Sequence, residues 1–195
     1  MEYQGDRAAD PRFEMDKDAH RRTGPFDAFI DRITGPGAGN DAYIAAYNSG
    51  RNTEALAVLN QDIGLFESLL DPALAHPNGM MWIGPTGTLT ALHHDLIAHV
   101  IGRKRLVVLP PSEVGRLYND IHVFSRVPDL DDPAIDAAVF PRLAGARAYE
   151  VVLEPGEAIF MPLAWWRQVK SLDFSVTLTF TNFRWPNDGY AGYPA

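Results

Sequence analysis

Cysteine is absent from this 195-residue sequence, and its absence narrows the chemistry that the chain can support. Without thiols there are no disulfides and no Cys-ligated zinc or iron–sulfur centres. Any metal ion must therefore be held by histidine and carboxylate side chains.

Long hydrophobic runs are missing as well. No window approaches the ~18 consecutive apolar residues that a membrane span needs. The N-terminal residues Met1-Glu-Tyr-Gln-Gly-Asp6 have neither the basic start nor the apolar segment of a signal peptide. We therefore expect a soluble, cytoplasmic protein that has no membrane partner.

Positive charge is scarce, with 17 Lys and Arg against 25 Asp and Glu and a formal net charge of −8. The overall field would repel backbone phosphates, so we expect no nucleic-acid partner. The basic cluster Arg103-Lys104-Arg105 is too short to reverse this expectation. The length fits one domain with a sizeable core.

The order of expected elements indicates an α+β fold. Residues 1–25 are polar without a sustained period and form an N-terminal arm. Residues 26–75 form a helical segment, in which an amphipathic helix begins at Phe26 and a second helix, capped by Asn52 or Thr53, runs to Leu70. Short strands separated by Pro/Gly turns follow over 76–195. We predict a β-barrel or jelly-roll core, with the N-terminal helices packed on the sheet.

The last expected strand has two chemically different faces. Its apolar side chains alternate with threonines, the former being Val176, Leu178 and Phe180 and the latter Thr177, Thr179 and Thr181. A strand of this kind suits a barrel wall whose interior is a polar site.

One tripeptide carries candidate metal ligands. If Thr88 to His99 forms one strand, the pleat sends His93 and Asp95 to the same face and His94 to the other. An imidazole and a carboxylate, completed by a distant histidine, make the facial triad of non-haem Fe(II) oxygenases. The tripeptide alone is weak evidence, because His-x-Asp is common in unrelated proteins.

The arrangement of the other motifs strengthens the signal. His93-x-Asp95 is followed by a basic turn and apolar strand ending at Pro111, then by Glu154-Pro-Gly and Trp165-Trp166, and finally by the threonine-rich strand. This order resembles the JmjC-type, cupin-like family of Fe(II)- and 2-oxoglutarate-dependent oxygenases, which includes the factor-inhibiting-HIF-like hydroxylases. The resemblance implies that the core is a double-stranded β-helix (jelly-roll or cupin).

The resemblance implies roles for individual residues. His93 and Asp95 would be the catalytic metal ligands, and Thr90 and Lys104 would hold the remote carboxylate of 2-oxoglutarate. Thr181 or Asn182 would line the pocket. The implied substrate is a protein, a peptide or a small amino-acid-like molecule, and a homodimer is kept open beside a monomer. A buried carboxylate independently needs a cation, and the ammonium of Lys104 supplies one.

The chain departs from the family pattern at the third metal ligand. Where the family has Trp-Trp-His-x-Val, this sequence has Trp165-Trp166-Arg167-Gln168-Val169. A guanidinium has no lone pair to donate and repels a divalent ion. Two hypotheses follow: an oxygenase in which Arg167 turns away from the site, or a non-catalytic cupin-like binding protein with an Arg167–Asp95 ion pair in place of the metal. The stretch between Asp95 and Gly102 is also short for the family, and strict alternation places Thr90 opposite His93, so that only a bulge or twist would bring Thr90 to the site.

Overall fold

The computed structural model describes residues 1–7, 16–37, 39–64, 66–74, 79–87, 89–91, 96–119, 125–127, 129–132, 135 and 137–186. Within these residues, no helix is long and apolar enough to cross a membrane.

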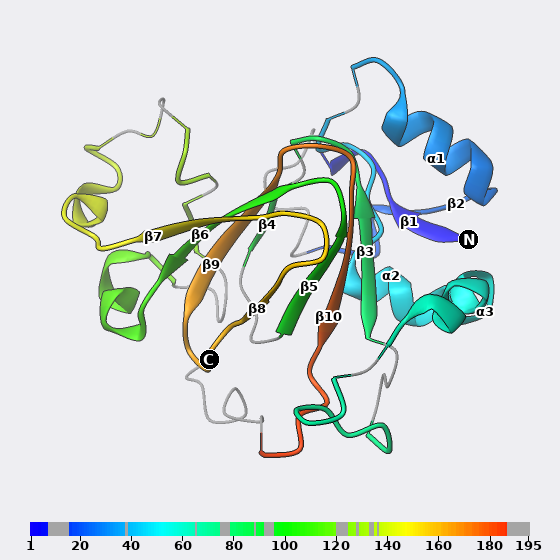
Figure 1. The fold of residues 1–195 in the computed structure, drawn as a ribbon. Helices are drawn as coiled ribbons and strands as arrows, with labels where there is room; N and C mark the ends of the chain where they lie inside the picture. The colour runs from blue at the N-terminus through cyan, green and yellow to red at the C-terminus, as the bar shows by residue number, and fades with distance from the viewer. Residues whose placement is uncertain are drawn as a thin grey trace.

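Eight antiparallel strands form two four-stranded sheets that face one another (Figure 1). The first sheet has the order β3-β10-β5-β8, and the second has the order β4-β9-β6-β7. Successive strands alternate between the two sheets, except that β6 and β7 both lie in the second, which is the connectivity of a double-stranded β-helix. The predicted jelly-roll core is confirmed. Its strands are β3 (Met80–Gly84), β4 (Leu89–Ala91), β5 (Leu96–Ile101), β6 (Lys104–Leu109), β7 (Tyr149–Leu153), β8 (Ala158–Phe160), β9 (Trp166–Ser171) and β10 (Ser175–Phe180).

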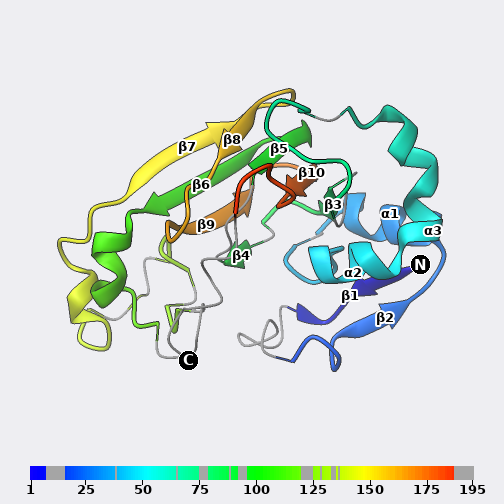
Figure 2. The same cartoon turned by 90° about the horizontal axis from the view of Figure 1, so that it is seen from below.

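The helices cover the outer face of the first sheet (Figure 2). Helix α1 (Phe26–Thr34) buries Phe29 and Ile33, four residues apart on one face. These side chains pack with residues of β3, β5 and β10 in one apolar cluster. Helix α2 (Ala46–Arg51) and helix α3 (Thr53–Leu56) complete this layer.

The second predicted helix is shorter than the sequence indicates. Helix α3 ends at Leu56 and gives way to the 3₁₀ turn η2 (Ala57–Asp62), so the helix expected to reach Leu70 is wrong in length. Asn52 makes no side-chain capping bond. Its amide instead donates to the carbonyl oxygen of Glu2 at 2.6 Å and accepts from the Glu2 N–H at 2.6 Å. A tertiary contact has taken the place of the local cap.

The described part of the N-terminal segment pairs with the domain. Strands β1 (Glu2–Gln4) and β2 (Arg21–Thr23) form a small antiparallel sheet. Gln4 bridges to Tyr43, and the Tyr3 ring lies 5.1 Å from that of Phe29. We expected an irregular arm here, but its two described parts are ordered. Backbone pairing and the contact between the Tyr3 and Phe29 rings hold them in place.

The stretch predicted as one strand from Thr88 to His99 is two strands. β4 pairs with β9 in the second sheet, whereas β5 pairs with β10 and β8 in the first. The chain thus crosses from one sheet to the other between Ala91 and Leu96. Side-chain alternation cannot be extrapolated across this crossing. His93 lies outside the described residues, so the expected opposition of Thr90 and His93 stays a prediction.

A long excursion between β6 and β7 covers the outer face of the second sheet. It contains the 3₁₀ turns η3 (Pro111–Arg116) and η4 (Pro141–Leu143). Trp166, Val107 and Leu109 pack with Leu117 beneath it in a separate apolar cluster. Trp166 is therefore a packing residue on the outer face of the second sheet.

Candidate functional site

Lys104 is buried between the two sheets. It is the first residue of β6, 3% exposed, and its register partners are Leu153 and Ser171. Leu106 and Val108 follow it at i+2 and i+4, and both pack in the apolar cluster that joins the sheets. The pleat therefore directs Lys104 into the same interior. Its Nζ atom lies 6.0 Å from the centre of the Tyr43 ring.

The surroundings of Lys104 oppose its positive charge. Burial, and then the nearby guanidinium of Arg167, lower the pKa of Lys104 from 10.5 to about 7. Among the described residues, no carboxylate contributes to the balance that sets this pKa. An ammonium placed in such surroundings is stabilised by an anion that enters beside it.

Arg167 lies on the same inner wall. It is 6% exposed and pairs in register with Val108, two residues before the inward-facing Val169. The residue at the third-ligand position therefore faces the interior and not the surface. One hypothesis required the Arg167 side chain to turn away from the site. Its burial shows that it does not do so by pointing into solvent.

The polar interior continues on the first sheet. His99 is buried in β5, its Nε2–H donates to the Gly102 carbonyl at 2.7 Å, and its Nδ1 accepts from the Thr177 hydroxyl at 3.1 Å. Burial and then the charge of Lys104 lower the pKa of His99, so the neutral ring is favoured. Both ring nitrogens are occupied, which removes His99 as a metal ligand.

The threonine face of β10 behaves as its alternation predicts. Thr177 and Thr179 are buried, and Thr179 accepts a hydrogen bond of 2.8 Å from the Trp82 indole. Leu178 and Phe180 face the helices on the other side. Sequence alternation identified this wall, but the pairing of Thr177 with His99 depends on strand register and could not be found from the sequence.

The structure locates the other predicted site residues unevenly. His93 and Asp95 lie outside the described residues, and only the backbone of Thr90 is described, in register with Val169. Thr181 follows the end of β10 and is exposed. Asn182 is buried, but its amide donates to the Asp71 carbonyl at 2.9 Å. The roles given to His93, Asp95, Thr90 and Thr181 stay predictions.

The residues present fit the two expected ligands differently. The buried ammonium of Lys104 suits one carboxylate of a dicarboxylate. For a metal, His93 and Asp95 offer two donors, and Arg167 cannot be the third because it has no lone pair. Within the described part of the chain, no three His, Asp or Glu side chains are placed so that they could hold a metal ion.

The connectivity and the polar, cationic interior define a cupin-type barrel. The chain matches the sequence model of the Cupin-like domain family over residues 2–188, and it belongs to that family. The expected relationship to JmjC-type proteins is confirmed by its relatives.

Three curated relatives illustrate the range of the family. Jumonji C domain-containing protein 5 of Drosophila melanogaster is 31% identical over 104 residues, which are 51% of this chain and 26% of the relative. Lysine-specific demethylase 8 of Xenopus tropicalis is 34% identical over 104 residues, or 51% and 24%. tRNA wybutosine-synthesizing protein 5 of Danio rerio is 28% identical over 197 residues, or 93% and 60%. The matches thus span about a quarter of the first two relatives.

One solved structure to which the chain is similar is YcfD, a ribosomal oxygenase from Escherichia coli, in complex with cobalt and 2-oxoglutarate. It aligns with a TM-score of 0.41 and 17% identity over 86% of this chain and 37% of that chain.

Replacing Lys104 with methionine is expected to stabilise the protein in the absence of ligand by about 2 kcal/mol at neutral pH, because an apolar side chain replaces a buried charge. The folded pKa of about 7 lies below the unfolded value of 10.5. Unfolded chains therefore bind more protons between these pH values, and the wild-type free energy of unfolding should rise with pH through that window. Below pH 7 the cost of the buried charge is fully present.

Urea denaturation at several pH values measures this effect. Lys104→Met should lack the rise between pH 7 and 10, while the control Lys170→Met, at a partly exposed lysine that pairs with Asp129, should keep it. Parallel pH profiles for wild type and Lys104→Met would contradict the assignment of a buried ammonium.

Proposed function

We propose that this protein is an Fe(II)- and 2-oxoglutarate-dependent oxygenase that hydroxylates a protein, peptide or amino-acid-like substrate, with the distal carboxylate of 2-oxoglutarate on Lys104. The observation that carries the proposal is the cation buried between the sheets with no described carboxylate acting on its pKa. Membership of the Cupin-like family supports the same assignment.

Each part of the barrel has a task in this function. His93 and Asp95, with a third group other than Arg167, would hold the iron, and bound iron would supply the activation of dioxygen. Lys104 fixes one end of the cosubstrate, and a charge-assisted bond there sets its direction along the barrel. Leu106, Val108 and Val169 form an apolar wall next to it that excludes water and strengthens this bond.

A second candidate function rests on Arg167. A guanidinium buried on the inner wall, at the position of the third ligand, favours a non-catalytic protein that binds a dicarboxylate without iron. In that case Arg167 would take over the charge of the metal and pair with Asp95. The two functions share the ligand site at Lys104 and differ in whether iron binds.

Anaerobic titration with Fe(II) in the presence of 2-oxoglutarate separates them. The oxygenase predicts the visible charge-transfer band of an iron–2-oxoglutarate complex. Arg167→His should raise iron affinity by roughly tenfold or more, because a donor replaces a repelling cation. Arg167→Gln, which removes the charge without adding a strong donor, is the matched control.

Calorimetry with 2-oxoglutarate alone completes the experiment. Binding of 2-oxoglutarate without any iron-dependent band would favour the non-catalytic protein. Absence of 2-oxoglutarate binding with and without iron would overturn both.

A further inference from the structure

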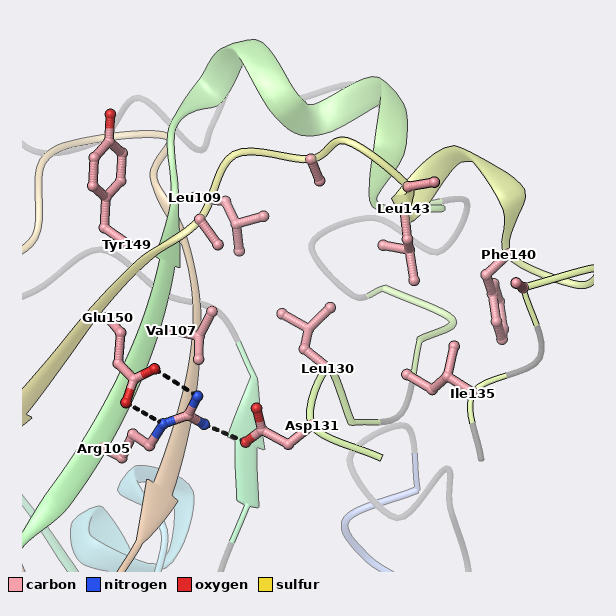
Figure 3. Close-up of a pocket in the computed structure, with 14 residues that line it drawn as sticks. Arg105, Val107, Leu109, Leu130, Asp131, Ile135, Phe140, Leu143, Tyr149 and Glu150 are labelled. Atoms are coloured by element: carbon pink, nitrogen blue, oxygen red, sulfur yellow. Dashed lines mark hydrogen bonds and ion pairs between the residues drawn. The ribbon is translucent and has the colours of Figure 1, made fainter. Parts of the chain in front are cut away.

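A cavity of about 480 Å³ lies outside the barrel, between the outer face of the second sheet and the excursion that follows β6 (Figure 3). Its floor is formed by the outward side chains of β6, and its roof by residues of the excursion. Most of its lining is apolar: Val107, Leu109, Leu130, Ile135, Phe140 and Leu143. The volume and the apolar walls are those of a small-molecule site.

One end of this cavity is charged. The Arg105 guanidinium donates to both carboxylate oxygens of Glu150, at 2.7 and 2.8 Å, and also pairs with Asp131 (Figure 3). Asp131 and Arg105 are each 24% exposed as side chains, and Glu150 is 55% exposed. Two carboxylates thus share one guanidinium, which leaves this end of the cavity with a net negative charge.

The charge selects the kind of head group that can enter. A ligand carboxylate would face Asp131 and Glu150 across a few ångströms and would have to displace one of them from Arg105. A primary ammonium is attracted by both carboxylates and can donate to either without breaking its bond to Arg105, because each oxygen accepts more than one hydrogen bond. The apolar walls then receive the rest of the molecule.

We propose that this cavity is a second binding site, and that its ligand is a small apolar molecule with one primary ammonium group. The ammonium lies against Asp131 and Glu150, and the hydrocarbon part fills the space between Leu130, Phe140 and Leu143.

This site is independent of the barrel interior. Arg105, Val107 and Leu109 alternate along β6 with the inward-facing residues, so the cavity and Lys104 lie on opposite faces of one sheet. The proposal therefore does not rest on the oxygenase function, and Lys104→Met should leave the binding of an amine unchanged.

A matched series of probes tests the proposal on the wild-type protein. We expect 4-phenylbutylamine to bind more tightly than 4-phenylbutanol, and the alcohol more tightly than 4-phenylbutyrate, when measured by calorimetry. The amine should exceed the carboxylate by at least about tenfold, as expected for a charge-assisted hydrogen bond. Tighter binding of the carboxylate, or equal binding of all three, would overturn the proposal.

Two substitutions test whether the amine binds in this cavity. Asp131→Asn keeps the shape and an acceptor for Arg105 but removes one charge, so it should reduce the preference for the amine over the alcohol by about tenfold. Ala146→Leu fills part of the cavity and should weaken the amine and the alcohol equally. Ala28→Leu, on an exposed face of α1, is the size-matched control and should change neither.

Amine binding that survives Ala146→Leu unchanged would show that the ligand binds elsewhere. If Ala146→Leu fails to fold, the probe ranking on wild type and the effect of Asp131→Asn still decide the question.

Discussion

Replacing Lys104 with methionine should raise the dissociation constant for 2-oxoglutarate by roughly a hundredfold or more, because a buried carboxylate would lose its cation. Methionine keeps the length and apolar character of the side chain, so the loss reports the charge and not the packing. Lys170→Met, at a lysine of the same sheet that is paired with Asp129, should change the affinity less than about twofold. Isothermal titration calorimetry measures both.

The pH dependence of this binding is a second readout of the same residue. Only the protonated amine attracts the carboxylate, and the pKa of Lys104 is about 7 before the ligand enters. The affinity should therefore be constant below pH 7 and should fall above it by up to about tenfold per pH unit, with the uptake of up to one proton per ligand.

Calorimetry in buffers of different ionisation enthalpy counts that proton. An affinity that does not change between pH 6 and 9 would show that Lys104 does not bind the carboxylate. Equal loss of iron and 2-oxoglutarate binding in Lys104→Met would mean that the lysine supports the barrel and does not hold the ligand.

Substituting alanine at Gly102 should destabilise the protein by about 3–5 kcal/mol, because the backbone there has no room for a side chain. Gly102 joins β5 to β6 with a φ of +76°, and an added Cβ would lie 2.1 Å from the Phe174 carbonyl oxygen. Either the turn or the β9–β10 connection has to move. The Gly102 carbonyl also accepts the bond from His99, so the polar interior would be disturbed as well.

Gly87 provides the matched control. Its φ of +81° is similarly unusual for other residues, but an added Cβ would meet no described residue within 4 Å. Gly87→Ala should therefore cost only the conformational penalty, about 1 kcal/mol. Chemical denaturation measures both variants, and equal losses would show that the contact with Phe174 is relieved at little cost.

Local periodicity explains which elements the sequence predicted well. The spacing of Phe29 and Ile33 identified α1, and the alternation along Ser175–Phe180 gave the two faces of β10. In both, the buried face of one element follows directly from neighbouring residues. The polar face of that last strand also indicated correctly that the barrel has a hydrogen-bonding interior.

Features that depend on distant partners were missed. Asn52 bonds to Glu2 across 50 residues, and no local pattern distinguishes this contact from a helix cap. The crossing between β4 and β5 was hidden because no glycine or proline marks a break between Ala91 and Leu96. The hydrogen bond between His99 and Thr177 likewise depends on the register of β5 against β10, which the sequence does not reveal.

The sequence by itself determined the barrel class, the helical layer and the residues capable of chemistry, since each depends on side-chain type and short-range spacing. Only the tertiary structure decided that Lys104 and Arg167 share one buried wall, although 63 positions along the chain separate them. That arrangement depends on the pairing of β6 with β9, and burial there sets the pKa of Lys104. Solvent exclusion is a property of packed layers, which no single stretch of sequence contains.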